Sequence, residues 1–353
     1  MKVCHITTVH KANDIRVFLK QCSSLSEAGH EVTLLASNDK DECKNGVRIK
    51  ALKKRDRAFF RLLFNLPSVL IYLLRNKFDI YHAHDPELLP ILFILHLTGR
   101  KVIYDMHENF PKQLTSKKIS APIKRIIGFI WPKLEIFVFK RIGVVYAETS
   151  YKHDYPLTPR SVDVLNMPII NKINSICKSK RSIFTYVYVG GVTEDRYCLK
   201  TLEALLELQK SGFDVGFECI GNIRSKTLKQ KIESYASKIS NVTFHGPLAP
   251  EEAWAIVATC HVGIAMLMPM PNYVDSYPTK LFEYIAMEIP VVTSDFPLYE
   301  DVVIKSKVGI CVNPHSAGDF MNAMVRLYKD KVFYDSCVEN TKGLLKERFS
   351  WEK

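Results

Sequence analysis

The chain alternates short apolar runs with helical stretches, and this pattern restarts midway through the sequence. Val3–Thr8 and Glu31–Ala36 have the length of strands, and Ile15–Ala28 between them has helical periodicity. Strands that alternate with helices indicate parallel sheets, because parallel neighbours need a crossover connection. The other strands expected in the first half are Ile80–Ala83, Lys101–Tyr104 and Val144–Ala147.

The second series of strands begins near residue 184, after a polar stretch. A length of 353 residues is sufficient for two domains, each with its own core. We place the linker near 165–180 and predict two doubly wound α/β domains, 1–165 and 166–335, facing each other across a cleft at the carboxyl ends of their sheets. The strands expected in the second half are Phe184–Val189, Phe217–Ile220, Val242–His245, Val262–Met266 and Val291–Thr293, with a helix at Leu199–Ser211.

Positive charge is concentrated in the first half. Residues 1–165 carry 27 Lys and Arg against 16 Asp and Glu, a net charge of +11, which leaves +1 for residues 166–353. Cations interleave with large apolar residues over 53–64 and 117–131. Such stretches are either basic amphipathic helices on an anionic membrane surface or core helices with solvated cations. The charge asymmetry favours the membrane surface, and no nucleic-acid-binding motif accompanies it, so we expect no nucleic-acid partner.

The cellular setting is inferred from cysteine usage and from the absence of targeting patterns. The nine Cys residues form no Cys-x-x-Cys pair and no cluster with metal-ligand spacing, which favours reduced thiols. There is no secretory signal pattern and no run of about 18 uncharged apolar residues. We therefore expect a cytoplasmic protein that is peripheral on the inner face of the cell membrane.

The segment 275–283 predicts a binding loop that leads into a helix. Pro278 suits the first helical position, so the N–H groups of the next three residues would lack partners within the helix. An open helix start attracts anions, and Lys280 adds a full positive charge. Glu283, one turn further, offers a carboxylate to a vicinal diol such as a ribose. Taken alone, the segment is also compatible with an ordinary capped helix.

This segment, an acidic residue followed by seven residues and then Glu, resembles the donor site of retaining glycosyltransferases of family 4, which have the two-domain GT-B fold. The resemblance implies that Glu283 holds the ribose and that Asp275 lies near the donor sugar, where the family usually has Glu. It extends over nearly the whole chain, and it implies that residues 336–353 return toward the first domain. The donor-binding residues that we predict are Gly190, Gly191, Arg196, Gly246, Ser276, Thr279, Lys280, Leu281 and Glu283.

The glycine loop at 190–196 departs from the family pattern. Gly191 stands where the family often has Arg, and Arg196-Tyr197 replaces its Lys-Gly pair, so Arg196 keeps a cation suited to phosphate oxygens. No Gly-x-Gly-x-x-Gly fingerprint occurs, which argues against a dehydrogenase. A plain strand-to-helix turn remains the alternative for Gly190-Gly191.

Three residues gather in the loop after the first strand: His10, Asp14 and Arg16. The loop resembles a GT-B acceptor-side loop, although an Asp14–Arg16 pair that merely stabilises it is an equal alternative for Arg16. By the same resemblance His107 contacts the transferred sugar, and we predict His107, Asp275 and Glu283 as catalytic. His82, His84, Asp85 and Glu108 have ligand chemistry, but we predict no metal and structural roles for His82 and His84.

These observations predict a retaining glycosyltransferase with no cofactor. It would move a hexosyl or N-acetylhexosaminyl group from a nucleotide-diphosphate-sugar, UDP- or GDP-linked, to a hydroxyl of a lipid-linked glycan acceptor in surface polysaccharide biosynthesis. Two alternatives stay open: a GT-B-type UDP-sugar 2-epimerase, which needs no acceptor, and a non-catalytic GT-B binding protein.

Overall fold

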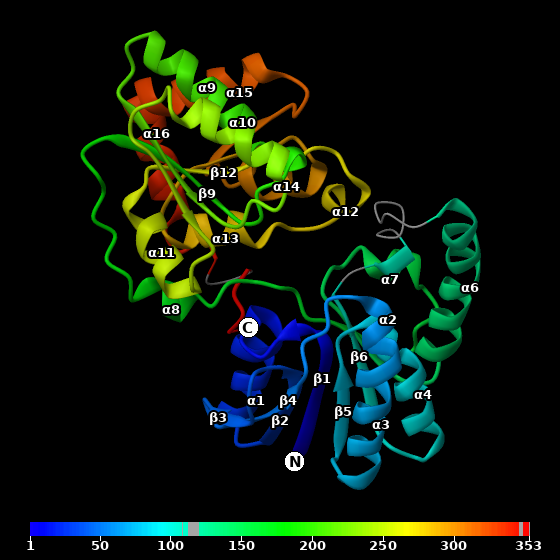
Figure 1. Ribbon diagram of the computed structural model, residues 1–353. Helices are drawn as coiled ribbons and strands as arrows, with labels where there is room; N and C mark the ends of the chain where they lie inside the picture. Colours follow the sequence, from blue (N-terminus) through cyan, green and yellow to red (C-terminus); the bar gives the residue numbers. More distant parts are fainter. Residues whose placement is uncertain (108, 112–119, 346–348, 353) are drawn as a thin grey trace. The chain divides into compact units, whose positions relative to one another are not determined.

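The computed structural model describes residues 1–107, 109–111, 120–345 and 349–352 (Figure 1). It contains two compact units, Met1–Asn166 and Met167–Lys353. The sequence had placed the boundary between residues 165 and 166. Glu108, Lys117 and Lys118, which entered the predictions above, lie outside the described residues.

The first unit is built on an eight-stranded sheet with the order β3-β4-β2-β1-β5-β6-β7-β8. All neighbours are parallel except β3 and β4, which form an antiparallel pair at one edge. The strands β3, β4 and β8 were not predicted: β3 and β8 have only three residues each, and the six-residue β4 alternates apolar Val47 and Ile49 with cations. The strands are β1 (Lys2–Lys11), β2 (Glu31–Ser37), β3 (Glu42–Lys44), β4 (Val47–Leu52), β5 (Ile80–Ala83), β6 (Val102–Met106), β7 (Gly143–Tyr146) and β8 (Ser161–Asp163).

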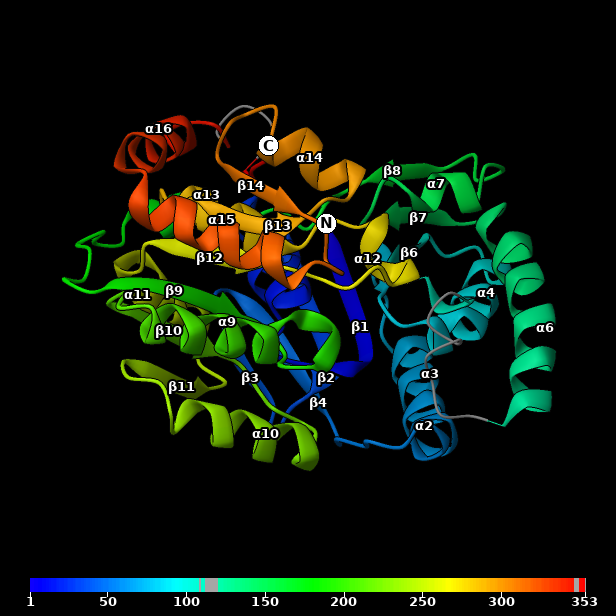
Figure 2. The ribbon, with the colours of Figure 1, turned by 90° about the horizontal axis from the view of Figure 1, so that it is seen from above.

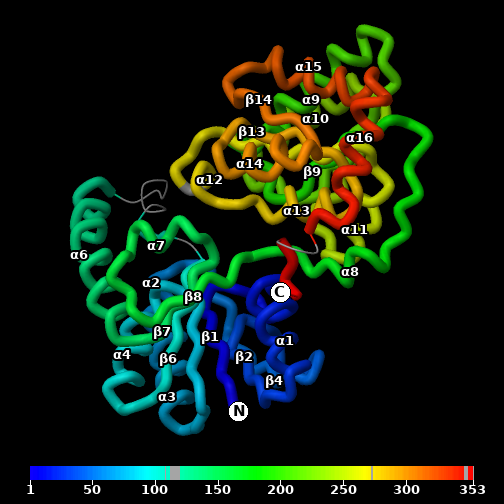
Figure 3. Tube along the Cα trace, turned by 180° about the vertical axis from the view of Figure 1, so that it is seen from behind, coloured from blue at the N-terminus to red at the C-terminus, as the bar shows by residue number. Residues whose placement is uncertain are grey.

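Helices cover both faces of this sheet. The predicted helix Ile15–Ala28 forms as η1 (Ile15–Cys22) and α1 (Ser23–Glu27), and Val17 and Phe18 pack on β2 and β4. Figures 1 to 3 show α3, α4 and α6 side by side on the other face. The remaining helices of the unit are α2 (Ala58–Phe60), η2 (Arg61–Asn65), α3 (Leu66–Arg75), η3 (Pro86–Leu88), α4 (Leu89–Leu97), α6 (Ala121–Phe139) and α7 (Tyr151–Asp154).

The second unit holds a six-stranded, fully parallel sheet with the order β11-β10-β9-β12-β13-β14. This order places the first strand of the unit in the middle, as in doubly wound nucleotide-binding domains. All five predicted strands form, and β14 was missed. The strands are β9 (Phe184–Val189), β10 (Val215–Ile220), β11 (Val242–Gly246), β12 (Val262–Ala265), β13 (Val291–Ser294) and β14 (Gly309–Val312).

The helices of the second unit cover the two faces of its sheet. In Figure 1, α9, α10 and α15 lie on one side, and α8, α11 and α13 lie on the other. The predicted helix at Leu199–Ser211 corresponds to α9. The helices are α8 (Ile170–Asn174), η4 (Glu194–Arg196), α9 (Cys198–Lys210), α10 (Lys226–Ala236), α11 (Pro250–Thr259), α12 (Pro271–Val274), α13 (Thr279–Ala286), α14 (Pro297–Val303), α15 (Ala317–Lys329) and α16 (Lys331–Thr341).

The C-terminal segment makes its described contacts within the second unit. Helix α16 runs across the predicted boundary at 335/336. Further on, the Trp351 N–H donates to the Pro168 carbonyl at 2.9 Å, and the Glu352 carboxylate accepts from the Asn171 N–H at 2.8 Å. Residues 346–348 and 353 of this segment lie outside the described residues, and its return toward the first domain stays a prediction.

Two helical regions of the first unit expose large apolar side chains. Phe59, Leu63 and Phe129 are 66%, 51% and 65% exposed. The alternative that the apolar residues of 59–64 are core is therefore wrong. The continuous helical region 58–75 is also, within the described ranges, the one helix long and apolar enough to cross a membrane by length and composition, whereas the sequence analysis expected none. It includes Arg61 and Arg75 and packs Val69 and Leu73 against the sheet.

Candidate functional site

Two loops at the carboxyl edge of the second sheet meet backbone to backbone. Gly190 follows β9 and Gly221 follows β10, with φ of 131° and 151°. A Cβ on Gly221 would overlap the Gly190 carbonyl group, so this approach needs glycine. The Gly191 carbonyl accepts from the Tyr188 hydroxyl at 2.8 Å, and the Gly246 carbonyl accepts from the Gly221 N–H at 2.8 Å. The loops therefore present a narrow glycine edge beside the predicted phosphate site.

Two cations lie at this glycine edge. A Cβ built on Gly190 would lie 3.6 Å from an Arg196 guanidinium nitrogen and 3.7 Å from the Lys280 amine. The Lys280 amine is buried, has no hydrogen-bond partner among the described residues, and lies 4.0 Å from the centre of the Tyr188 ring. Burial, and after it the repulsion of Arg196, lowers the pKa of Lys280 from 10.5 to about 7. A buried, unpaired amine beside a second cation is a strong attractor for an anion.

The start of α13 differs from the prediction in two respects. Pro278 is the residue before the helix, with an extended ψ of 116°, and Thr279 is the first helical residue. The Leu281 N–H donates to the Pro278 carbonyl at 2.9 Å. The expectation that the Leu281 N–H is unpaired is therefore wrong, because the first turn closes on the residue just before it.

The other predicted donor residues lie along the same segment. Glu283 is on α13, one turn beyond Thr279, and is partly buried. Asp275 is exposed, and Ser276 is partly buried, in the loop before the helix. Gly246, with φ of 70°, ends β11, and a Cβ there would meet nothing within 4 Å. The structure thus gathers Gly190, Gly191, Arg196 and Lys280 by measured contacts, and it places the rest on adjoining loops.

Sequence analysis missed the tyrosines that shape this site. The Tyr273 hydroxyl donates to an Asp195 oxygen at 2.7 Å and lies 3.4 Å from Arg196 Nε, which holds the guanidinium in place. Tyr284 packs under Gly263, where a Cβ would overlap its ring, and its hydroxyl accepts from the Val189 N–H at 2.9 Å. The local signal for this packing was Gly263 in β12, because a residue without a side chain permits α13 to approach the sheet closely.

The loop after β1 carries the predicted acceptor-side residues of the first unit. Asp14 caps η1 by accepting from the N–H groups of Arg16 and Val17, both at 2.9 Å, and lies 3.1 Å from His10 Nδ1. The Arg16 side chain does not pair with Asp14; it makes a two-point contact with Asp105, at 2.8 and 3.3 Å. The alternative of an Asp14–Arg16 side-chain pair is therefore wrong. Asp105 was missed, although an Asp two residues before His107 was the available signal.

His107 is held by this buried carboxylate. Its Nε2 lies 2.9 Å from an Asp105 oxygen and 3.1 Å from His84 Nδ1, and its ring centre is 5.4 Å from that of His10. Burial alone would raise the pKa of Asp105, but His107 and Arg16 lower it well below its usual range. The anionic Asp105 therefore fixes His107 with its Nε2 proton directed inward. The structure brings His10, Asp14, Arg16 and His107 together around Asp105.

Three further histidines, His5, His82 and His84, are buried and lie in ring contact with one another. His5, His82 and His84 bring ligand atoms within 4.8 Å of one another, and so do His84, Asp105 and His107. This convergence was not predicted, because His5 lies on β1, whereas His82 lies on β5 and His84 directly follows that strand. Burial lowers the pKa of His82 to about 3 and that of His84 to about 4, so both imidazoles are neutral at pH 7.

The two clusters differ in their charge. Asp105 is the only carboxylate in either cluster, and the Arg16 guanidinium already neutralises it. Asp85 takes a different role, accepting from the Thr7 hydroxyl at 2.9 Å and so fixing the end of β1. That the protein needs no metal remains a prediction.

Comparison with known proteins gives the family. Residues 184–330 match the family described as Glycosyl transferases group 1, and residues 16–151 match Glycosyltransferase Family 4. The chain belongs to the family 4, group 1 glycosyltransferases. This confirms the predicted family. A search of curated proteins gave no match.

Solved structures identify the fold of this glycosyltransferase as GT-B. Sucrose-phosphate synthase from Thermosynechococcus elongatus is 15% identical, with a TM-score of 0.75 over 99% of this chain and 95% of that one. WaaG, a glycosyltransferase involved in lipopolysaccharide biosynthesis, is 14% identical, with a TM-score of 0.73 over 99% and 96%. Anabaena HepE in complex with UDP-glucose is 12% identical, with a TM-score of 0.72 over 100% and 96%. The predicted fold class is confirmed.

Proposed function

We propose that this glycosyltransferase transfers a hexosyl or N-acetylhexosaminyl group from a UDP- or GDP-sugar to a glycan hydroxyl, with retention of configuration. The observation that carries the proposal is the unpartnered Lys280 amine beside Arg196 at the glycine edge. A diphosphate would supply the negative charge that this buried pair lacks. The crystallised complex of the similar Anabaena protein with UDP-glucose supports the same class of donor.

Stabilisation of the leaving diphosphate is the main chemical task of this site. Arg196 and Lys280 are already fixed, so they stabilise charge that develops on the phosphate oxygens without reorganising at the moment of reaction. Glu283 would accept the ribose hydroxyls, and Asp275 would lie near the donor sugar. His107 would contact the sugar hydroxyls through Nδ1, because Asp105 holds its Nε2. A phosphate oxygen of the leaving group would take the acceptor proton, so no separate nucleophile and no metal are required.

The donor site is tested with Lys280→Ala and Arg196→Ala. We expect each variant to remain folded and to lose at least a hundredfold in turnover, since a single preorganised donor of this kind contributes roughly 3–4 kcal/mol. Lys229→Ala, an exposed lysine on α10 of the same unit, is the matched control. UDP-, GDP- and ADP-sugars are first screened by thermal shift, because a ligand that binds the folded state raises its apparent stability. Near-wild-type activity of both site variants would disprove the assignment.

The class of reaction is tested by its products. Incubation with the nucleotide sugar and a lipid extract should release the nucleotide diphosphate and give a glycoside whose anomeric configuration, read by NMR, matches that of the donor. Incubation without acceptor should leave the nucleotide sugar unchanged. Isomerised nucleotide sugar would instead establish an epimerase, and binding without turnover would establish a non-catalytic protein.

We also propose that the first unit lies on an anionic membrane surface, where a lipid-linked acceptor of surface polysaccharide assembly would be presented. Exposed apolar side chains on 58–75 and α6 are flanked by cations, including Arg57, Lys124 and Arg125, and unit 1 carries nearly all of the net charge. Apolar insertion and attraction to anionic lipid act together in such helices. The role that WaaG has in lipopolysaccharide biosynthesis fits this setting.

Vesicle flotation tests the membrane surface. The wild type should float with phosphatidylglycerol vesicles and not with phosphatidylcholine vesicles. Phe59→Glu combined with Phe129→Glu should abolish flotation, whereas Val332→Glu, an 82% exposed apolar residue of the second unit, should not. Equal binding to both vesicle types, or unchanged flotation of the double variant, would refute this part of the proposal.

A further inference from the structure

A separate cavity opens at the carboxyl edge of the first sheet. It has a volume of about 790 Å³ and is lined by the loops that follow β1 and β2 and by the end of β4. The Ala12 N–H donates to the Ser37 carbonyl at 3.1 Å, and the Asn38 N–H donates to the Leu52 carbonyl at 3.3 Å, so backbone bonds tie the three walls together. Its size is that of a small-molecule site, and its edge is where doubly wound sheets bind ligands.

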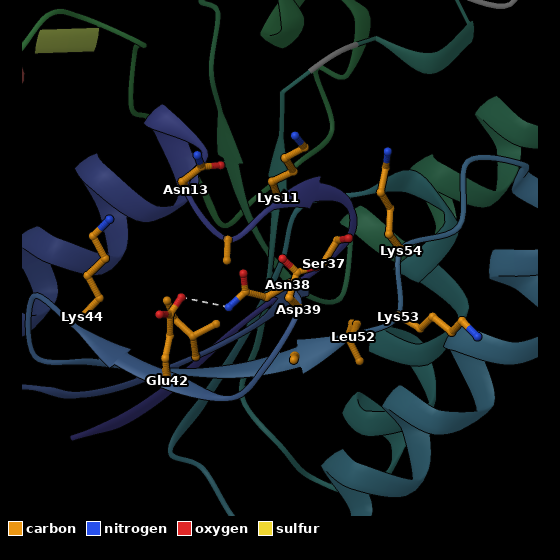
Figure 4. A pocket seen from close by; sticks show the side chains of 13 residues that line it. Lys11, Asn13, Ser37, Asn38, Asp39, Glu42, Lys44, Leu52, Lys53 and Lys54 are labelled. Carbon is orange, nitrogen blue, oxygen red and sulfur yellow. Dashed lines mark hydrogen bonds between the residues drawn. The ribbon is translucent and has the colours of Figure 1, made fainter. Parts of the chain in front are cut away.

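The lining carries a surplus of positive charge. Four lysines (Lys11, Lys44, Lys53 and Lys54) and two carboxylates (Asp39 and Glu42) line the cavity, and Lys54 pairs with Asp56 at 3.3 Å. In Figure 4, Lys44 and Lys53 lie at opposite ends of the cavity, and Lys11 lies between them. The Glu42 carboxylate already accepts from the Asn38 amide at 2.9 Å, while Lys11 and Lys53 take part in no ion pair within the described ranges.

Polar and apolar side chains of the lining suit a sugar ring. Asn13, Ser37 and Asn38 offer amide and hydroxyl groups that both donate and accept hydrogen bonds, which matches sugar hydroxyls. Ala12 and Ile49 supply apolar surface for a ring face. The cavity also shares its loop with the acceptor-side residues, since Lys11–Asn13 lies between His10 and Asp14.

We propose that this cavity binds a sugar residue that carries a carboxylate or a phosphate ester, as part of the acceptor glycan. The lysines would hold the oxyanion, and the amide groups would hold the ring hydroxyls. The glycan chain would then continue past His10 toward His107. This inference rests on the proposed transferase function, and it narrows the acceptor to an acidic glycan.

Binding is measured by calorimetry on the full chain, without donor, for three glycans. These are a hyaluronan tetrasaccharide with carboxylates, a phosphorylated mannose oligosaccharide and neutral chitotetraose. We expect at least one acidic glycan to bind tenfold or more tightly than chitotetraose, and whichever acidic glycan binds identifies the anionic group. Equal binding of acidic and neutral glycans, or no binding of any of them, would overturn the inference.

Charge removal in the cavity then tests its location. Lys11→Gln combined with Lys53→Gln should weaken acidic-glycan binding at least tenfold, whereas Lys2→Gln combined with Lys77→Gln, at the amino ends of β1 and β5, should not weaken it. Binding of UDP is measured in parallel and should be unchanged in both double variants. Unchanged glycan binding after loss of Lys11 and Lys53 would overturn the inference. Failure of the wild type to bind UDP or any other nucleotide would count against the donor site instead.

Discussion

Replacing Lys280 by Met should stabilise the protein and at the same time abolish donor binding. The Lys280 amine is buried without a partner, and its pKa is lowered from 10.5 to about 7. Each tenfold loss of proton affinity corresponds to ~1.4 kcal/mol, so keeping this lysine costs the folded state about 4 kcal/mol at pH 7. Met has a similar length and no charge, so Lys280→Met should raise the free energy of unfolding by as much as ~4 kcal/mol.

The stability of the wild type should depend on pH through the Lys280 amine. Between pH 7 and 10.5 the unfolded chain holds the Lys280 proton and the folded chain releases it. The stability of the wild type should therefore rise with pH in this window, and the advantage of Lys280→Met should shrink. A bound diphosphate restores the proton, so the affinity of the wild type for UDP should fall as the pH rises above 7.

Hydrogen exchange on peptides from β9 and α13, at pH 7 and pH 9, measures the stability of the second unit. Titration of the same samples with UDP measures binding. Lys229→Met is the control, and we expect it to change stability by less than about 0.5 kcal/mol, as exposed substitutions usually do. A Lys280→Met protein no more stable than the wild type at pH 7, or one that still binds UDP, would refute the reasoning.

Four further substitutions test close backbone packing and buried charge. Gly221→Ala should lower the free energy of unfolding by more than about 2 kcal/mol and abolish UDP binding, because its Cβ would overlap a backbone carbonyl. At Gly246 a Cβ would meet open space, so Gly246→Ala should lower the free energy of unfolding by only about 1 kcal/mol. Equal losses for the two variants in urea unfolding would contradict this difference. Burial raises the pKa of Glu135 from 4.5 to about 7. The stability that protonated Glu135 contributes is therefore fully present below pH 4.5 and is lost as the pH rises through 7. Glu135→Gln should flatten the profile of melting temperature against pH over this range. Asp105→Asn leaves the buried Arg16 cation unpaired and should cost about 3–5 kcal/mol in urea unfolding, and a loss under 1 kcal/mol would show that this pair is not structural.

Much of the fold followed from local patterns. The strands β5 and β9 were predicted to the residue, and the other predicted strands differ by one to three residues at an end, with the largest difference at the end of β1. Hydrophobic periodicity and turn residues predict an element from a window of about ten residues. Strands that alternate with helices can then form only a few parallel topologies. The hairpin of β3 and β4 escaped prediction because Glu42–Lys44 has no apolar alternation and gains its order by pairing with its neighbour.

Local sequence patterns also predicted some residues of the candidate sites and missed others. The segment 275–283 and the loop at 190–196 carried enough sequence signal to name the cations, and the loops after β1 and β6 carried enough to name His10 and His107. The role of Asp105 did not follow, since its partner Arg16 is 89 positions away in the sequence. The π-helical start of η1, capped by Asp14, brings that arginine over the sheet, and no local rule supplies this geometry.

By itself, the sequence determined the alternation of strands and helices in two series, the concentration of cations in the first half, and the presence of Arg196 in a glycine loop and of Lys280 at a helix start. Only the tertiary structure decided that Lys280 is buried over Tyr188 without a partner among the described residues, that the apolar residues of 59–64 face outward, and that four lysines line one cavity. The physical reason is that residue type and spacing are properties of the chain, whereas burial and pairing depend on segments that meet only when the sheets have formed.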